Sequence, residues 1–179
     1  MNEHSWKSLP LERWTEYELF HFLKATIYPD LEIIDLPYSF SDCMSMDKED
    51  DIELKCRKKH YDNMLIEKIK YDRLINRAKH SIKRPIYICS TPKGVWKWNL
   101  FNQLIIVWQN KDDLPVTTEF ENNNRIEKEV GFLDYCNAEC LYLEKTKPLK
   151  LSLIKLEEPT WSVAITGRKF AMASGTTIP

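Results

Sequence analysis

Residues 51–57 read D-I-E-L-K-C-R, with charged and apolar residues alternating without a break. A period of two predicts a strand, because successive side chains of a strand point to opposite faces. One face of this strand carries two acids followed by two bases, which are Asp51, Glu53, Lys55 and Arg57. Either this charged face is exposed to solvent or it forms a metal-dependent site, and the flanking sequence has to decide between the two.

The flanking segments predict a mixed α/β fold. Residues 41–46 read as a strand, and the polar turn D47-K-E-D-D joins it to 51–57 as an antiparallel hairpin. Helices are expected over 16–27, where Thr15 and Glu18 form a capping box, and over 61–80. Further strands are expected at 31–36, 85–90, 95–100, 104–108 and 131–135. The fold class is therefore a small mixed sheet flanked by helices, with extra strands towards the C-terminus.

The expected second helix carries a lysine in an unusual place. Lys68 falls within an apolar stripe made of Tyr61, Met64, Leu65, Tyr71 and Ile75. A lysine on a packing face is costly unless its ammonium reaches solvent or a partner. Lys68 is therefore open to two interpretations, a side chain that extends to solvent or a functional group.

Composition describes an ordinary globular chain with an uneven distribution of charge. The 179 residues suit one domain, and the formal net charge is −1. Residues 55–97 nevertheless contain thirteen Lys or Arg and only three Asp or Glu. This basic segment is consistent with a polyanionic partner, although lysines that are merely solvated would give the same pattern.

Several classes of protein are disfavoured. No apolar run is long enough to span a bilayer, and no signal sequence is evident at the N-terminus, so we expect no membrane partner. Five cysteines, an odd number, favour free thiols in a reducing, cytoplasmic compartment. Cys136 and Cys140 supply only two of the four ligands that a zinc site usually needs, so we expect buried thiols there. Four glycines in all, with no phosphate loop, disfavour a nucleoside-triphosphate enzyme.

Three charged residues of the hairpin fit the chemistry of phosphodiester hydrolysis. Such hydrolysis needs a hard cation, and Mg²⁺ is held by one or two carboxylates together with water and phosphate oxygens. The hairpin brings Asp42 back towards the face that carries Glu53 and Lys55. A lysine two residues after an acid points the same way, so its ammonium can favour hydroxide and stabilise developing negative charge.

The stretch Y38-S-F-S-D42, the strand D51-I-E-L-K-C-R and the segment Y61…M64-L-I-E-K-I-K-Y71 together resemble the PD-(D/E)XK nuclease-like superfamily, in particular its small phage and bacterial members. The later T117-T-E-F-E-N-N-N-R125 is similar to a loop of the same group. The resemblance covers about 14–135, and Ser41 stands where many members have proline. It implies a restriction-endonuclease-like αβββαβ core in a single domain of residues 1–179, with a C-terminal extension over about 140–179.

The resemblance also implies roles for individual residues. Asp42 and Glu53 would bind Mg²⁺ or Mn²⁺ with the carbonyl of Leu54, and Lys55 would place or activate the attacking water. Lys68 would act from the helix, and Glu16 would be a third acid. The residues that would contact DNA are Arg57, Lys58, Lys59, Lys70, Arg73 and Lys93.

The resulting hypothesis is a Mg²⁺- or Mn²⁺-dependent DNA endonuclease in the cytoplasm of a bacterial or phage-infected cell. The alternative is a catalytically inactive protein of the same fold that binds DNA or forms part of a phage particle. A variant of the first hypothesis is resolution of branched DNA, which usually requires a homodimer to place two sites.

Overall fold

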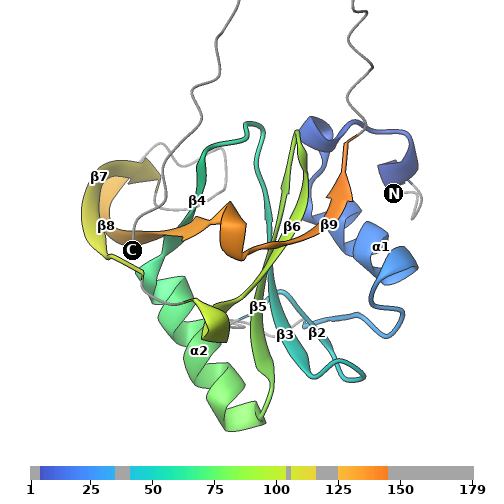
Figure 1. The fold of residues 1–179 in the computed structure, drawn as a ribbon, viewed down its shortest axis with the longest axis horizontal. Coiled ribbons are helices and arrows are strands. Elements are labelled where there is room, and N and C mark those ends of the chain that lie inside the picture. The colour runs from blue at the N-terminus through green and yellow to red at the C-terminus, as the bar shows by residue number, and fades with distance from the viewer. Residues whose placement is uncertain (1–4, 35–40, 104–105, 116–124, 145–179) are drawn as a thin grey trace, which may run out of the picture. The chain divides into compact units, whose positions relative to one another are not determined.

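The computed structural model describes residues 5–34, 41–103, 106–115 and 125–144 (Figure 1). Within these ranges the chain forms a six-stranded sheet, a three-stranded sheet and two α-helices. The larger sheet has the order β1 (Glu32–Ile33), β2 (Cys43–Ser45), β3 (Asp50–Cys56), β5 (Arg84–Thr91), β6 (Gly94–Asn99) and β9 (Glu139–Leu143). The smaller sheet has the order β4 (Asn63–Glu67), β8 (Arg125–Asp134) and β7 (Gln109–Pro115). The helices are α1 (Glu16–Thr26) and α2 (Lys68–Ser81), and the 3₁₀ turns are Ser5–Lys7, Leu11–Arg13, Leu100–Asn102 and Tyr135–Asn137.

Strand β3 lies inside the larger sheet, so both of its edges are paired. It runs antiparallel to β2, with Cys43 opposite Ile52, and parallel to β5, with Glu53 opposite Tyr87. The connection from β3 to β5 contains β4 and α2, as a crossover between parallel strands requires. The predicted mixed α/β class, the strand at 51–57 and the hairpin with 41–46 are therefore confirmed, with strand bounds that shift by up to two residues.

The two helices cover opposite faces of the larger sheet (Figure 1). On one face, Ile52 and Leu54 of β3 pack in a core with Leu19 and Leu23 of α1. On the other face, Tyr87, Cys89 and Trp98 pack with Leu74 of α2 and with residues of the smaller sheet. The apolar residues of β3 therefore face α1, and the charged residues between them belong to the side of α2.

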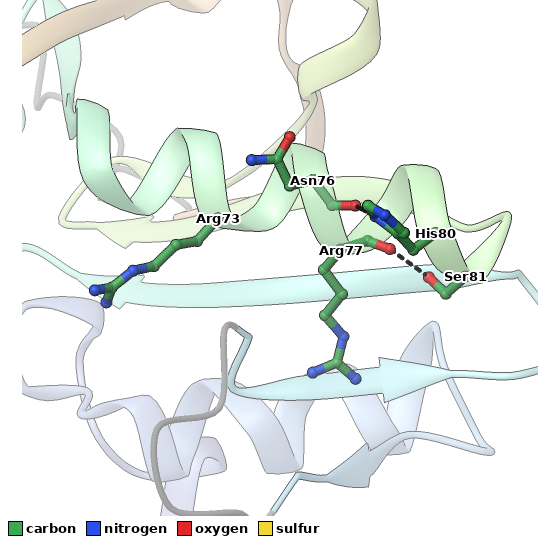
Figure 2. A pocket seen from close by; sticks show the side chains of 5 residues that line it. All are labelled: Arg73, Asn76, Arg77, His80 and Ser81. Atoms are coloured by element: carbon green, nitrogen blue, oxygen red, sulfur yellow. Dashed lines mark hydrogen bonds between the residues drawn. The ribbon is translucent and has the colours of Figure 1, made fainter.

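The charged face of β3 is not exposed to solvent. Asp51 has no exposed surface and Glu53 is 7% exposed. Arg77 of α2 reaches Asp51 with a nitrogen–oxygen distance of 3.2 Å, and the hydroxyl of Ser81 donates to the same oxygen at 3.1 Å. Figure 2 shows Arg77 extending away from the axis of α2, and the hydroxyl of Ser81 bonded to the carbonyl oxygen of Arg77. The interpretation of this face as solvent-exposed is therefore wrong, because α2 covers it and supplies cations to it.

The second helix begins later than the sequence predicts. The first residues of the expected helix 61–80 form strand β4, and α2 starts at Lys68. In β4, Met64 and Ile66 are buried whereas Leu65 is half-buried, which is the alternation of a strand. Antiparallel pairing with β8, a distant segment, outweighs the helical spacing of the apolar residues. The first helix and its capping box from Thr15 are confirmed.

Other expectations are met in part. The strands expected at 85–90, 95–100 and 131–135 correspond to β5, β6 and the end of β8. Of the strand expected at 31–36, β1 covers two of the four described residues, and 35–36 lie outside the described part. Residues 106–108 are not a strand, because β7 begins at Gln109, and 104–105 lie outside the described residues. Cys136 and Cys140 are exposed, so the prediction that they are buried is wrong. Cys140 is exposed because β9, which carries it, is an edge strand with a mostly exposed surface.

The chain separates into a unit spanning Met1–Lys145 and a second unit spanning Thr146–Pro179. All of the elements above belong to the first unit. The residues from 145 onward lie outside the described part, and the single-domain organisation over 1–179 stays a prediction.

Replacing Arg77 by alanine is expected to destabilise the fold, because it removes a cation from a fully buried carboxylate. We expect a loss of about 2 kcal/mol, since Ser81 and, at 3.8 Å, Lys83 still contact Asp51. Urea denaturation followed by circular dichroism measures the effect. Lys79→Ala, an exposed position on the same helix, is the control; equal midpoints for the two variants would contradict the importance of this ion pair.

Candidate active site

Asp42 lies just before strand β2 and is tied to β3 through both its backbone and its side chain. Its N–H donates to the carbonyl of Ile52 at 3.0 Å, and its Oδ2 accepts the N–H of Leu54 at 2.7 Å. The carboxylate thus takes the place of a main-chain acceptor beside β3. Since the N–H and C=O of one strand residue point to the same edge, the Leu54 carbonyl is directed to the edge where Asp42 lies.

Glu53 lies next to this position and under the first turn of α2. The Nζ of Lys70 is 2.5 Å from Glu53 Oε1, and the carboxylate is almost fully buried whereas the lysine is partly exposed. Lys70 lies on the same side of α2 as Arg77, since the two residues are seven apart and therefore nearly two turns apart. The two acids on this side of β3 thus each receive a cation from one stripe of the helix.

Lys55 completes the group and contacts the other helix. Its Nζ lies 3.0 Å from Oε1 of Glu16, the first residue of α1. The lysine side chain is 13% exposed and the glutamate 47% exposed, so the ammonium is largely enclosed while its partner faces solvent. The site is therefore built from four segments: the start of α1, the residue before β2, the end of β3 and the start of α2.

Lys68 does not take the place that the sequence predicts for it. Its Nζ lies 2.6 Å from Asp72 in the next turn of α2 and 5.7 Å from the ring centroid of Trp108. The hydrogen bond that Lys68 donates to Asp72 raises the pKa of Lys68. Because α2 begins at Lys68, this residue is not on the packing face of a longer helix, and Lys70 is the α2 lysine that contacts Glu53. The sequence predicted only a DNA contact for Lys70. The spacing of Lys70 and Arg77, seven residues, could have indicated that both side chains lie on the side of α2 that faces the acids.

The site holds more negative charge than its own lysines relieve. Burial raises the pKa of Asp42 to about 7, with a further contribution from the charge of Glu53. The charge of Glu16 acts in the same direction, and Lys70 opposes it. Burial by itself would lower the pKa of Lys70, but its attraction to Glu53 outweighs this and the pKa is raised. Such an arrangement favours either a proton on Asp42 or an added cation.

The donor atoms suit a hard cation. In the described residues, no group of three or more His, Cys, Asp or Glu side chains is placed to hold a metal ion. Mg²⁺ does not require three, because one or two carboxylates with water and phosphate oxygens suffice. Asp42 and Glu53 supply two carboxylates that repel each other, which a divalent cation would relieve. Oxygen donors of this kind fit Mg²⁺ or Mn²⁺ and do not fit a soft metal.

A cleft opens beside the site. It has a volume of about 480 Å³ and lies between the end of β3, the start of α2 and the three-stranded sheet. Lys55 and Lys70 line it, and so do Arg57, Lys111 and Lys128. The sequence did not single out Lys111 or Lys128, because both lie far along the chain on β7 and β8 and only the pairing of β4 with β8 brings them near.

The remaining residues predicted to contact DNA are spread more widely. Lys58 and Lys59 are exposed just after β3, and Lys93 is exposed at the turn between β5 and β6. Arg73 lines a separate shallow hollow along α2 with Asn76, Arg77, His80 and Ser81 (Figure 2). Of the six predicted residues, the structure places only Arg57 and Lys70 in the cleft next to the carboxylates. The resembling loop at 117–124 lies outside the described residues.

Comparisons with protein-family models, with curated proteins and with solved structures give no match to this chain. In the described part of the chain, no helix has the length and apolar character needed to cross a membrane.

Substituting Asp42 by asparagine is expected to change how stability depends on pH. The pKa of Asp42 is about 7 in the fold and 3.8 ordinarily, so between these values the folded protein binds more protons than the unfolded chain. The contribution of Asp42 to the stability of the wild type therefore falls as pH rises from about 4 to 7. Asp42→Asn removes this slope, and we expect it to be more stable than the wild type by about 2 kcal/mol at pH 8 and equal to it at pH 4.

Urea denaturation at both pH values measures this difference. Asp30→Asn is a control of opposite sign, because the pKa of Asp30 is lowered, chiefly by the N–H of Asp47, so its charged form stabilises the fold above its ordinary pKa. That control should be less stable than the wild type at pH 8, and the difference should shrink as the pH falls below the ordinary pKa of Asp30. A pH-independent difference between wild type and Asp42→Asn would show that the carboxyl group is not under electrostatic stress.

Proposed function

We propose that this protein is a metal-dependent DNA endonuclease whose site comprises Asp42, Glu53 and Lys55. The observation that carries the proposal is a group of paired charges around the end of β3: Asp42 accepts the N–H of Leu54, Glu53 contacts Lys70, and Lys55 contacts Glu16. Lys55 and Lys70 also line the adjacent cleft, together with further cations. Two neighbouring carboxylates with a single contacting lysine, Lys70 on Glu53, are a costly arrangement for a merely structural element. Chemistry that uses a divalent cation and a polyanion accounts for both the acids and the surrounding bases.

The order of elements supports the proposal at the level of the fold. If β4 is taken as an addition between β3 and α2, the order α1, β1, β2, β3, α2 and β5 is the order that an αβββαβ core would have. In this assignment the acid and the lysine lie at the end of the central strand, where the start of α1 and the start of α2 both approach it. This is the place where four segments can supply polar groups without interrupting the core.

Asp42 and Glu53, with the carbonyl of Leu54, would hold Mg²⁺ or Mn²⁺. The bound cation would polarise the scissile phosphate and lower the pKa of the attacking water. Lys55, held by Glu16, places a fixed positive charge beside the acids, where it favours hydroxide and stabilises negative charge that develops on phosphate oxygens. Lys70 neutralises Glu53 in the absence of substrate and is near enough to contact a phosphate in its presence. Glu16 acts on the reaction through Lys55.

The internal ion pairs favour a second candidate. Glu53 is already paired with Lys70 and Lys55 with Glu16, so the same residues would also stabilise a protein that binds DNA without cutting it, or a phage structural component. Resolution of branched DNA by a homodimer, and a cytoplasmic location, stay predictions. The mass of the protein in solution tests the homodimer directly.

Activity is expected on circular DNA in the presence of Mg²⁺ or Mn²⁺ and not in EDTA, followed as nicked and linear products on gels. Glu53→Ala and Lys55→Ala should each reduce cutting at least about 100-fold, because each removes a group that acts on the reacting phosphate or water. Thermal melting should show that both variants are folded. Lys68→Ala is the matched lysine control and should cut like the wild type, because its ammonium pairs with Asp72. Cutting that survives in both Glu53→Ala and Lys55→Ala would reject the assignment.

Calorimetry with Mn²⁺ alone separates the two candidates. The endonuclease predicts one binding event that is lost in Asp42→Ala and kept in Asp30→Asn, because only Asp42 lies at the acid pair. The non-catalytic protein predicts no binding heat and an unchanged melting temperature when Mn²⁺ is added. This measurement needs no knowledge of the substrate.

A further inference from the structure

The cleft beside the acids has two kinds of surface. Among the described residues that line it, the cations are Lys55, Arg57, Lys70, Lys111 and Lys128, and the one carboxylate is that of Glu67. These cations come from β3, α2, β7 and β8, or from the residue that follows β3, so they surround the cleft instead of following one helix. A ring of cations from separate elements suits a flexible polyanion that threads between them.

Apart from Asn63, the other described residues of the lining are apolar or aromatic. Met64, Leu65 and Ile66 of β4 line one part, and Leu114 and Pro115 of β7 line another. Two aromatic side chains also line the cleft and retain much exposed surface: Tyr61, which is 56% exposed, and Phe132 of β8, which is 37% exposed. An apolar lining does not suit phosphate groups, because it offers no hydrogen bonds, but it does suit the faces of nucleobases.

The positions of some cations are fixed before any ligand arrives. Arg57 lies close enough to the buried Tyr87 hydroxyl for its charge to act on it, and Lys128 Nζ lies 3.0 Å from Glu67 Oε1. Lys70 and Lys55 are held by Glu53 and Glu16. Side chains positioned in this way lose little conformational freedom on binding.

We propose that the cleft binds unpaired nucleotides adjacent to the scissile phosphate, so that the substrate is single-stranded DNA or a single-stranded region of a larger DNA. This inference rests on the proposed endonuclease for the identity of the substrate. The cations bind the phosphates, and Tyr61 and Phe132 stack on bases. A paired duplex does not present its base faces sideways, because they are covered by the neighbouring base pairs, so aromatic side chains in a side cleft reach only unpaired bases.

The volume of the cleft agrees with this choice. About 480 Å³ lies within the range of pockets that hold small molecules, roughly 300–1,000 Å³. A pocket of this size accepts a nucleotide or two. A double helix could contact its rim but could not enter.

Binding is measured on the full chain in EDTA, so that cleavage plays no part, with a fluorescent oligonucleotide and the same sequence annealed as a duplex. The single strand should bind at least about tenfold more tightly, and Tyr61→Ala and Phe132→Ala should each weaken it about tenfold through lost stacking. Phe101→Ala is the matched control, since Phe101 is 46% exposed and is not part of the cleft lining. Lys111→Gln should weaken binding and reduce its salt dependence, and Lys79→Gln should do neither.

The outcomes distinguish this inference from the proposed function. The inference is rejected if the duplex binds as tightly as the single strand or more tightly. It is also rejected if both Tyr61→Ala and Phe132→Ala leave single-strand affinity unchanged. Metal-dependent cutting of the duplex would in either case still support the proposed endonuclease. Preferential single-strand binding that depends on both rings, without cutting in Mn²⁺, keeps the cleft as a nucleic-acid site and rejects the endonuclease. Loss of folding in a cleft variant is detected by its melting curve, and the other aromatic variant then decides.

Discussion

Burial of the charged face of β3 beneath α2 is the constraint on which the structure depends. A strand that alternates charged and apolar residues can expose one face, but here the sheet is covered on both sides, so Asp51 and Glu53 are enclosed. Buried carboxylates are tolerated only with cations or hydrogen bonds. Arg77 and Lys70, two turns apart on α2, supply those cations and thereby fix where the helix lies on the sheet.

The ion pairs Asp51–Arg77 and Glu53–Lys70 differ in how fully the charge of the acid is matched. Asp51 has no exposed surface and is contacted by Arg77, Ser81 and Lys83, so its charge is matched from several sides. Glu53 lies nearer the end of the strand, where the carboxylates of Glu53, Glu16 and Asp42 face only two lysines, Lys70 on Glu53 and Lys55 on Glu16. The first pair accounts for the position of α2. The second leaves an excess of negative charge at the edge of a cleft lined by cations, and the proposed use of a divalent cation and a nucleic acid follows from that excess.

The three-stranded sheet supplies much of the lining of the cleft beside the acids. Strand β4 replaces the first turns of the expected helix and pairs with β8, which brings Lys128 and Phe132 towards the acids from more than sixty residues away. With Lys111 and Leu114 from β7, these residues give the cleft its cations and its apolar lining. The aromatic and basic residues around the acids thus come from elements that share no local motif.

The sequence by itself determined the strand at 51–57, the hairpin with Asp42, the capped first helix and the candidate trio of Asp42, Glu53 and Lys55, because period, turn composition and capping are local properties. Only the tertiary structure decided that α2 begins at Lys68 and that Lys70 contacts Glu53. The apolar residues at 64–66 are compatible with a helix or a strand by spacing, and pairing with β8 selects the strand. Likewise, no local pattern reports whether a charged strand face is solvated or covered, since burial depends on segments brought together by the whole fold.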